Sequence, residues 1–168
     1  MHRSDNDTES FIKIDKTSDF PIQNLPYGIF QEKGKNNPRV GVAIGDLILD
    51  LSILEKQGLI HTNSENPVFD QPYLNKFMEL GKETWKIVRS TIQNLLDKDT
   101  PDLRDNHQLR LQVFFERKQC DLLVPIQTTD YTDFYASRHH AFNVGSMFRG
   151  PENALMDNWL HIPKKGVF

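Results

Sequence analysis

The residues of this chain whose types could do chemistry gather in one stretch, Asp130–Leu160. Within its first twenty residues lie two aspartates, two tyrosines, two arginines and two histidines, namely Asp130, Asp133, Tyr131, Tyr135, Arg138, Arg149, His139 and His140. No other window of the sequence holds so many groups that can ligate a metal, move a proton or bind a carboxylate. This stretch is therefore the candidate functional site.

Asp133 and Tyr135 lie two residues apart, so they share a face if this piece is extended. Asp133 could then offer a hard oxygen ligand to Mg²⁺ or Ca²⁺, with Tyr135 beside the same site. Asp130 is the second candidate ligand, but it could equally cap the turn that follows. One or two carboxylates do not complete a calcium site, which takes about six to eight oxygens.

His139 and His140 are adjacent, so on a regular element they point apart and at most one faces a given site. A histidine suits a general base, although a hydrogen-bonded structural histidine is the alternative. Arg149 could grip a carboxylate with two parallel bonds, or be an ordinary surface arginine. Gly145 and Gly150 suggest tight backbone and hence a loop. The chemistry alone indicates a hard-metal, carboxylate-binding site with a histidine base.

The bulk properties of the chain exclude several classes of protein. With 168 residues it can hold one domain, or one domain and part of another. A net charge of −3 argues against a nucleic-acid binder. Cys120 is the only cysteine, which fits a reducing compartment. The first ten residues lack an apolar signal region and no run is long enough to cross a membrane. We therefore expect a cytoplasmic protein.

Two regions carry clear secondary-structure patterns. Arg39–Leu51 alternates apolar residues around Gly45-Asp46, which predicts a hairpin with a primed turn, with Asp46 and Asp50 facing solvent. Asp70–Leu96 predicts a short helix, begun by Asp70 as its cap and ended near Gly81, and then a second helix. The apolar stripe of the second helix is expected to be a core face and consists of Trp85, Val88, Ile92, Leu95 and Leu96.

The remaining segments give shorter signals. Short strands are predicted at Ser10–Ile14, Leu109–Val113 and Cys120–Val124. Ser18–Phe30 is expected to be an ordered loop, and Asp97–Asp105 a charged connector broken by Pro101. Pro125 marks a boundary. The pattern indicates a small β-rich domain with inserted helices, followed by the start of something else.

Four collinear stretches of the sequence resemble one known family. The reactive segment, DYTDFYASRHHAFNVGSMFRGPENALMDNWLHIP, closely resembles the block DYTDFYxSxxHAxNxGxMFRxxxNALxxNWxxxP of the fumarylacetoacetase family. The stretches SDFPIQNLPYGIF, GVAIGDLILDLS and FDQPYLNKFMELGKETW resemble its opening and its helical insertion. The resemblance runs from about Ser10 to Pro163.

The resemblance implies a mainly β fold with helices, of the α+β class. It implies a disordered extension over 1–9, an SH3-like barrel domain over 10–124, and the truncated start of a β-roll catalytic domain over 125–168. The family hydrolyses a carbon–carbon bond of 4-fumarylacetoacetate to give fumarate and acetoacetate, in tyrosine and phenylalanine breakdown. The family works as a homodimer with Ca²⁺ or Mg²⁺ on this small-molecule substrate. From the net charge and the lack of a long apolar run, no nucleic-acid or membrane partner is expected.

The resemblance also assigns roles to four positions. Asp133 matches a metal ligand, and Tyr135 and Arg149 match residues that bind substrate. His140, and not His139, matches the general base that activates water. After Pro163 the chain departs from the family and reads KKGVF, so a further substrate-binding tyrosine, the other metal ligands and most of the catalytic domain are expected to be missing.

This departure leaves two hypotheses open. The chain is a fragment of an enzyme, whether as a truncated product, an alternative transcript or a broken gene model. Alternatively, it is a non-catalytic module in which an SH3-like domain serves only for interaction. In either case the last segment is expected to expose apolar side chains, namely Phe142, Met147, Phe148, Leu155 and Trp159.

Overall fold

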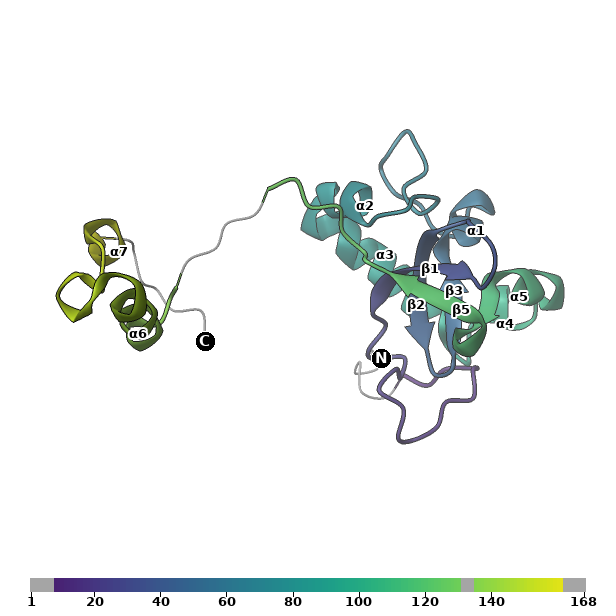
Figure 1. The fold of residues 1–168 in the computed structure, drawn as a ribbon. Coiled ribbons are helices and arrows are strands. Elements are labelled where there is room, and N and C mark those ends of the chain that lie inside the picture. Colours follow the sequence, from purple (N-terminus) through teal and green to yellow (C-terminus); the bar gives the residue numbers. More distant parts are fainter. Residues whose placement is uncertain (1–7, 131–134, 162–168) are drawn as a thin grey trace. The chain divides into compact units, whose positions relative to one another are not determined.

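The computed structural model describes residues 8–130 and 135–161, so the predicted metal ligand Asp133 and residues 1–7 of the extension predicted over 1–9 lie outside the described residues. The chain divides into two compact units between Gln127 and Thr128. The strands lie in the N-terminal unit, and helices α6 and α7 lie in the C-terminal unit (Figure 1).

A five-stranded antiparallel sheet forms the centre of the N-terminal unit (Figure 1). Its strands are β1 (Tyr27–Glu32), β2 (Arg39–Ile44), β3 (Leu47–Asp50), β4 (Phe114–Glu116) and β5 (Cys120–Leu123). Their order in the sheet is β4-β3-β2-β1-β5, so the last strand returns to pair with the first. The sheet is open, with β4 and β5 as its edges.

The hairpin predicted within Arg39–Leu51 is confirmed as β2 and β3. Ile44 pairs with Leu47, so Gly45 and Asp46 form a two-residue turn. Gly45 has a φ of +54°, whereas no non-glycine residue in the described part has a positive φ. A positive φ at the first turn position alone is typical of a type II′ turn, so the primed turn is confirmed. Asp46 is exposed, as predicted.

The prediction that Asp50 faces solvent is wrong, because its side chain is fully buried. Its carboxylate caps helix α1 (Leu51–Lys56) by accepting a hydrogen bond from the backbone N–H of Ser52 at 2.9 Å. Arg39 Nε donates to the same carboxylate at 2.5 Å. A buried carboxylate requires partners of this kind, and sequence alternation gives no sign of them. Leu51 consequently begins a helix instead of ending a strand.

The helices predicted within Asp70–Leu96 are confirmed, with a later start. Helix α2 covers Asn75–Glu79 and helix α3 covers Gly81–Leu96. Asp70 does not cap a helix; its carboxylate pairs with Lys56 at 2.7 Å. The predicted core stripe of α3 is also confirmed. Its buried residues are Thr84, Val88, Ile92, Leu95 and Leu96, and Trp85 packs against the same core.

The strand predicted over Leu109–Val113 is wrong, because helix α5 (His107–Val113) occupies this stretch. The side chain of Asn106 accepts a hydrogen bond from the backbone N–H of Leu109 at 3.1 Å and caps the helix. Leu109 and Val113 are both buried, and residues four apart share one face of a helix. A local cap and tertiary packing together override the apparent alternation.

Four shorter predictions had mixed outcomes. Cys120–Val124 is confirmed as strand β5, but Ser10–Ile14 contributes only one isolated bridge, from Ser10 to Asp97. The connector Asp97–Asp105 contains helix α4 (Pro101–Arg104). Proline is tolerated in its first turn because a backbone N–H at that position would have no partner within the helix. The loop predicted over Ser18–Phe30 ends where β1 begins.

Apolar side chains cover both faces of the sheet, because successive residues of a strand point to opposite sides. In β1, Ile29 belongs to the larger cluster, to which α1, α3 and α5 contribute, and Phe30 belongs to a smaller one. The smaller cluster holds Phe30, Ile48 and Cys120, with Phe115 packed against it. The free thiol of Cys120 is therefore part of this second core.

The fold as a whole is α+β, as predicted, with one antiparallel sheet. The finer prediction of a mainly β protein is wrong, because the described helices hold more residues than the described strands. Among the described residues, no helix is both long and apolar enough to span a membrane.

The described part of the C-terminal unit holds three short elements. They are helix α6 (Arg138–Arg149), the 3₁₀ turn η3 (Pro151–Asn153) and helix α7 (Asp157–His161). The expected exposure of apolar side chains is confirmed: Phe142 is 36% exposed, Met147 76% and Phe148 79%. Leu155 and Trp159 are partly buried.

Candidate functional site

Helix α6 carries two of the candidate residues, His140 in its first turn and Arg149 at its end. The helix begins after Ser137, whose hydroxyl oxygen accepts a hydrogen bond from the backbone N–H of His140 at 3.4 Å. It ends at Gly150, whose φ of +79° stops the helical path. The prediction of a loop around Gly145 is therefore wrong, since this glycine lies inside the helix.

Tyr135 and His140 are brought together at the start of α6. Their rings meet edge to face, with centroids 4.7 Å apart. The indole N–H of Trp159, in α7, donates to the backbone carbonyl of Tyr135 at 2.6 Å. Tyr135 is 42% exposed and His140 is also exposed, so both rings can meet a ligand from solvent. Of the adjacent histidines, it is His140 that contacts the tyrosine.

Helix α6 does not place Arg149 next to Tyr135 and His140. Nine residues separate it from His140, which is two and a half helical turns and about 14 Å along the axis. The two side chains therefore leave the helix on opposite sides. A single site that uses both must be completed by groups that connect them, such as the substrate itself or other parts of a larger protein.

The guanidinium of Arg149 is held by backbone carbonyls. Its Nε donates to the carbonyl of Asn153 at 3.2 Å, and one terminal nitrogen donates to the carbonyl of Ala154 at 2.9 Å. Both bonds lie on one side of the planar group and fix its direction. Arg149 is exposed, so the fixed guanidinium remains open to a ligand.

The described residues do not complete a metal site. Within 8–130 and 135–161, no three His, Cys, Asp or Glu side chains gather as a metal would require. The placement of Asp133 is not described, so the predicted metal ligand stays a prediction.

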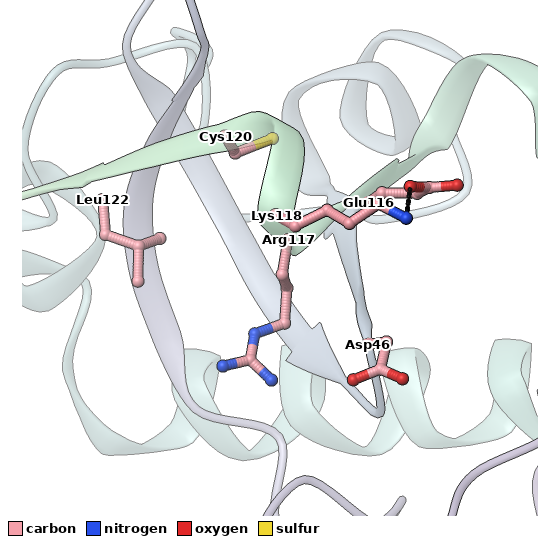
Figure 2. Close-up of a pocket in the computed structure, with 6 residues that line it drawn as sticks. All are labelled: Asp46, Glu116, Arg117, Lys118, Cys120 and Leu122. Carbon is pink, nitrogen blue, oxygen red and sulfur yellow. Dashed lines mark ion pairs between the residues drawn. The ribbon is translucent and has the colours of Figure 1, made fainter.

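The N-terminal unit contains a cavity of about 440 Å³ that the sequence did not indicate (Figure 2). It is lined by Asp46, Glu116, Arg117, Lys118, Cys120 and Leu122. Lys118 pairs with Glu116 at 2.9 Å, as the dashed line in Figure 2 marks. Burial raises the pKa of the Cys120 thiol, which disfavours the reactive thiolate.

Arg117 is not free to serve as an anion-binding group in this cavity. Its guanidinium lies over the ring of Phe20, 4.4 Å from the centroid, and donates to the carbonyl of Gly45 at 3.2 Å. Lys118 and Glu116 thus pair with each other, Arg117 is engaged outside the lining, and Cys120 is not an activated nucleophile. The candidate site remains the segment that holds Tyr135, His140 and Arg149.

Comparison with known proteins addresses the N-terminal unit most directly. The family model described as "Fumarylacetoacetase N-terminal" matches residues 23–125, which is more than half of the chain. The chain belongs to this family. The match covers the whole five-stranded sheet of the fumarylacetoacetase N-terminal unit and the helices inserted between β3 and β4. It ends before Tyr135, so it does not test the candidate site residues.

Relatives named fumarylacetoacetase match a longer part of the chain. The protein of Dictyostelium discoideum is 51% identical over 156 residues, which cover 92% of this chain and 36% of the relative. That of Bos taurus is 51% identical over 156 residues and that of Arabidopsis thaliana 48% over 157, each covering 92% of this chain and 37% of the relative. The chain spans little more than a third of the length of these curated relatives.

Proposed function

We propose that this chain supplies the N-terminal domain and the first active-site segment of a fumarylacetoacetase. The reaction is hydrolysis of a carbon–carbon bond of 4-fumarylacetoacetate to fumarate and acetoacetate, in tyrosine and phenylalanine catabolism. One observation carries the proposal: identity of about half to relatives of that name over 92% of the chain. The activity is proposed for a whole protein of the relatives' length, of which this chain spans little more than a third.

His140 is the proposed general base. Cleavage requires water to add to a carbonyl carbon while the carbon–carbon bond breaks and the departing enolate takes up a proton. A histidine that removes a proton from the water makes this addition possible near neutral pH. The edge-to-face contact with Tyr135, at 4.7 Å between centroids, restricts the rotation of the imidazole ring and so supports its orientation toward one site.

Tyr135 and Arg149 are the proposed substrate-binding residues. The substrate carries carboxylates, and a guanidinium fixed in direction binds a carboxylate with two parallel hydrogen bonds. The bonds from Arg149 to the carbonyls of Asn153 and Ala154 support this role, because they orient the group before a ligand arrives. The phenol of Tyr135 is exposed beside His140 and can contact the same ligand.

Asp133 is the proposed ligand that this segment gives to Ca²⁺ or Mg²⁺. When bound, such an ion would polarise the β-diketone oxygens of the substrate. The proposal for Asp133 rests on the resemblance of DYTDFY to the family block, and the other ligands are assigned to parts of the family's catalytic domain.

We extend the proposal to three further properties. An SH3-like barrel for the N-terminal unit is supported by the strand order β4-β3-β2-β1-β5, in which the last strand follows a 3₁₀ turn, η2 (Arg117–Gln119), and pairs with the first. A homodimer and a cytoplasmic location are proposed from the family resemblance of the four sequence stretches.

The test is a graft protein, in which residues 10–163 of this chain replace the matched segment of the Dictyostelium relative. We expect the graft protein to convert fumarylacetoacetate to fumarate and acetoacetate. His140→Ala in the graft protein should lower kcat by about 10²–10⁴-fold, while the adjacent His139→Ala should change it little. A folded graft protein without activity, or equal losses from both histidine variants, would contradict the proposal.

The 168-residue chain itself is the second arm of this test. By the family resemblance, the other metal ligands and the groups that support the transition state are supplied from outside these 168 residues, so we expect no turnover of fumarylacetoacetate by the purified chain. The alternative function, a non-catalytic SH3-like interaction module, is favoured by the self-contained core of the N-terminal unit. That alternative would be supported by a folded but inactive graft protein.

A further inference from the structure

A backbone carbonyl lies directly against helix α6 at Gly145. If Gly145 carried a Cβ atom, that atom would lie 1.9 Å from the carbonyl oxygen of Ala154 and 2.7 Å from its carbon. It would also lie 2.8 Å from a terminal nitrogen of Arg149. Non-bonded atoms do not come this close, so a side chain at position 145 requires a shift of its surroundings, of which the Ala154 carbonyl and the Arg149 guanidinium are nearest.

The need for glycine at this position is spatial and not conformational. Gly145 lies inside α6 with helical backbone, a conformation that every L-residue except proline adopts readily, and alanine adopts better than glycine. An ordinary glycine in the middle of a helix only weakens it. The compensating feature here is the close approach of the Ala154 carbonyl, with both Gly145 and Ala154 buried.

The same carbonyl oxygen orients Arg149. It accepts a hydrogen bond from the arginine's terminal nitrogen at 2.9 Å, while the carbonyl of Asn153 accepts one from Nε at 3.2 Å. These two bonds fix the plane of the guanidinium. If the Ala154 carbonyl moves, the plane is released, although Arg149 itself is unchanged.

We propose that Gly145 is a positioning residue for Arg149: its missing side chain lets the Ala154 carbonyl reach α6 and hold the guanidinium in the direction in which it binds a substrate carboxylate. The inference rests on the proposed function of Arg149. It assigns to Gly145 an effect on substrate affinity that acts through Ala154 and Arg149, without any contact with substrate.

The geometry is tested first in the 168-residue chain, by NMR of its arginine side chains. In the wild type, the Nε–H of Arg149 should exchange with water about tenfold more slowly than that of Arg138, which begins the same helix and is exposed. Gly145→Ala should remove this difference. The matched control is Ser146→Ala, which also adds an alanine to α6 and should preserve it.

Circular dichroism of the same variants separates local release from unfolding. Gly145→Ala should keep the helical signal, because alanine favours the helix, while the exchange of Arg149 becomes fast. A Gly145→Ala chain in which Arg149 stays protected would overturn the inference. So would a wild-type chain in which the Nε–H groups of Arg149 and Arg138 exchange equally fast.

The consequence for substrate is tested in the graft protein. Gly145→Ala should raise KM by up to about 100-fold and change kcat less, as Arg149→Lys should. A purely structural defect would instead lower the active fraction, with kcat reduced and KM unchanged, and that result would overturn the inference. Ser146→Ala should leave both constants unchanged.

The two arms distinguish failure of the inference from failure of the proposed function. If Gly145→Ala leaves KM unchanged while Arg149→Lys raises it, the inference fails and the proposed role of Arg149 stands. If the wild-type graft protein is folded but inactive, the proposed function fails, and the NMR comparison still decides whether Gly145 holds the Ala154–Arg149 arrangement.

Discussion

Arg39 is a buried cation that contacts two aromatic rings, a carboxylate and a backbone carbonyl among the described residues. It is 8% exposed, and its guanidinium lies over the rings of Phe30 and Phe115, 4.4 and 4.9 Å from their centroids. Its Nε donates to Asp50, and a terminal nitrogen donates to the carbonyl of Asn37 at 3.0 Å. This group links strand β2 to the capped start of helix α1.

Replacing Arg39 by methionine should destabilise the N-terminal unit by about 3–5 kcal/mol, because it leaves the carboxylate of Asp50 buried without its cation. The measurement is urea unfolding followed by circular dichroism. Lys35→Met is the matched control, since Lys35 pairs with Glu32 at 2.7 Å but is 59% exposed, and it should cost less than about 1 kcal/mol. Equal losses from the two variants would contradict the importance of the buried pair.

Tyr27 should make the stability of the N-terminal unit depend on alkaline pH. Burial raises the pKa of its phenol from 10.0 to about 12. The folded state therefore keeps a proton that the unfolded state loses above pH 10, and stability falls as pH rises from about 10 to 12. Below pH 10 this contribution is constant. The whole loss is about 2–3 kcal/mol, measured by urea unfolding at several pH values.

Tyr27→Phe is the variant that isolates this effect. It should remove the part of the alkaline loss that Tyr27 causes, leaving the part due to lysines and other tyrosines. The hydroxyl of Tyr27 is buried without a hydrogen-bond partner among the described residues, so its removal should stabilise the unit by about 1 kcal/mol at neutral pH. A variant that is less stable at neutral pH would indicate a partner for the hydroxyl, such as a buried water.

At the scale of elements, helix α3 contains its own matched pair of isoleucines. Ile92 is fully buried in the larger cluster, whereas Ile87 is 52% exposed. Ile92→Ala should cost about 2–5 kcal/mol of unfolding free energy through lost burial and a residual cavity. Ile87→Ala should cost less than about 1 kcal/mol, because its side chain loses little burial and alanine favours the helix. Similar losses would mean that α3 packs differently.

The same helix shows what periodicity predicts well and where it stops. Over the sixteen residues of α3 the apolar stripe is long enough to determine both the element and its buried face. Over Leu109–Val113 the same rule fails, because five residues fit alternation and helical spacing about equally. The deciding feature is the cap from Asn106, which lies outside that window. The burial of Asp50 was not predicted for a related reason, since its partner Arg39 is eleven residues away.

The candidate site was predictable as a set of residues but not as an arrangement. Residue types and family resemblance single out Tyr135, His140 and Arg149 from the sequence alone. Their geometry depends on helix α6, which was not predicted because Gly145 and Gly150 indicated a loop. Once the helix is known, its period places His140 and Arg149 two and a half turns apart, on opposite sides of the helix. The function of Gly145 is visible only when a carbonyl from outside the helix is seen beside it.

At the scale of the whole molecule, the N-terminal unit should fold without the C-terminal unit. The buried residues of both clusters lie between Ile22 and Cys120, and the five strands end at Leu123. A chain that stops after Gln127 should therefore have the same urea midpoint as the full chain. The independence of the unit follows from where its core residues lie, since hydrophobic burial is its main stabilising term.

A shorter chain that stops after Lys118 is the control for this truncation. It removes strand β5, whose residues pair with β1 from Ile29 to Glu32, and also removes Cys120 from the smaller cluster. We expect this chain to be unfolded or to lose several kcal/mol, because the ladder of β1 is left open and the second core loses a member. If the chain that stops after Gln127 is itself clearly less stable than the full chain, residues 128–168 stabilise the first unit, and the non-catalytic module would then have to include them.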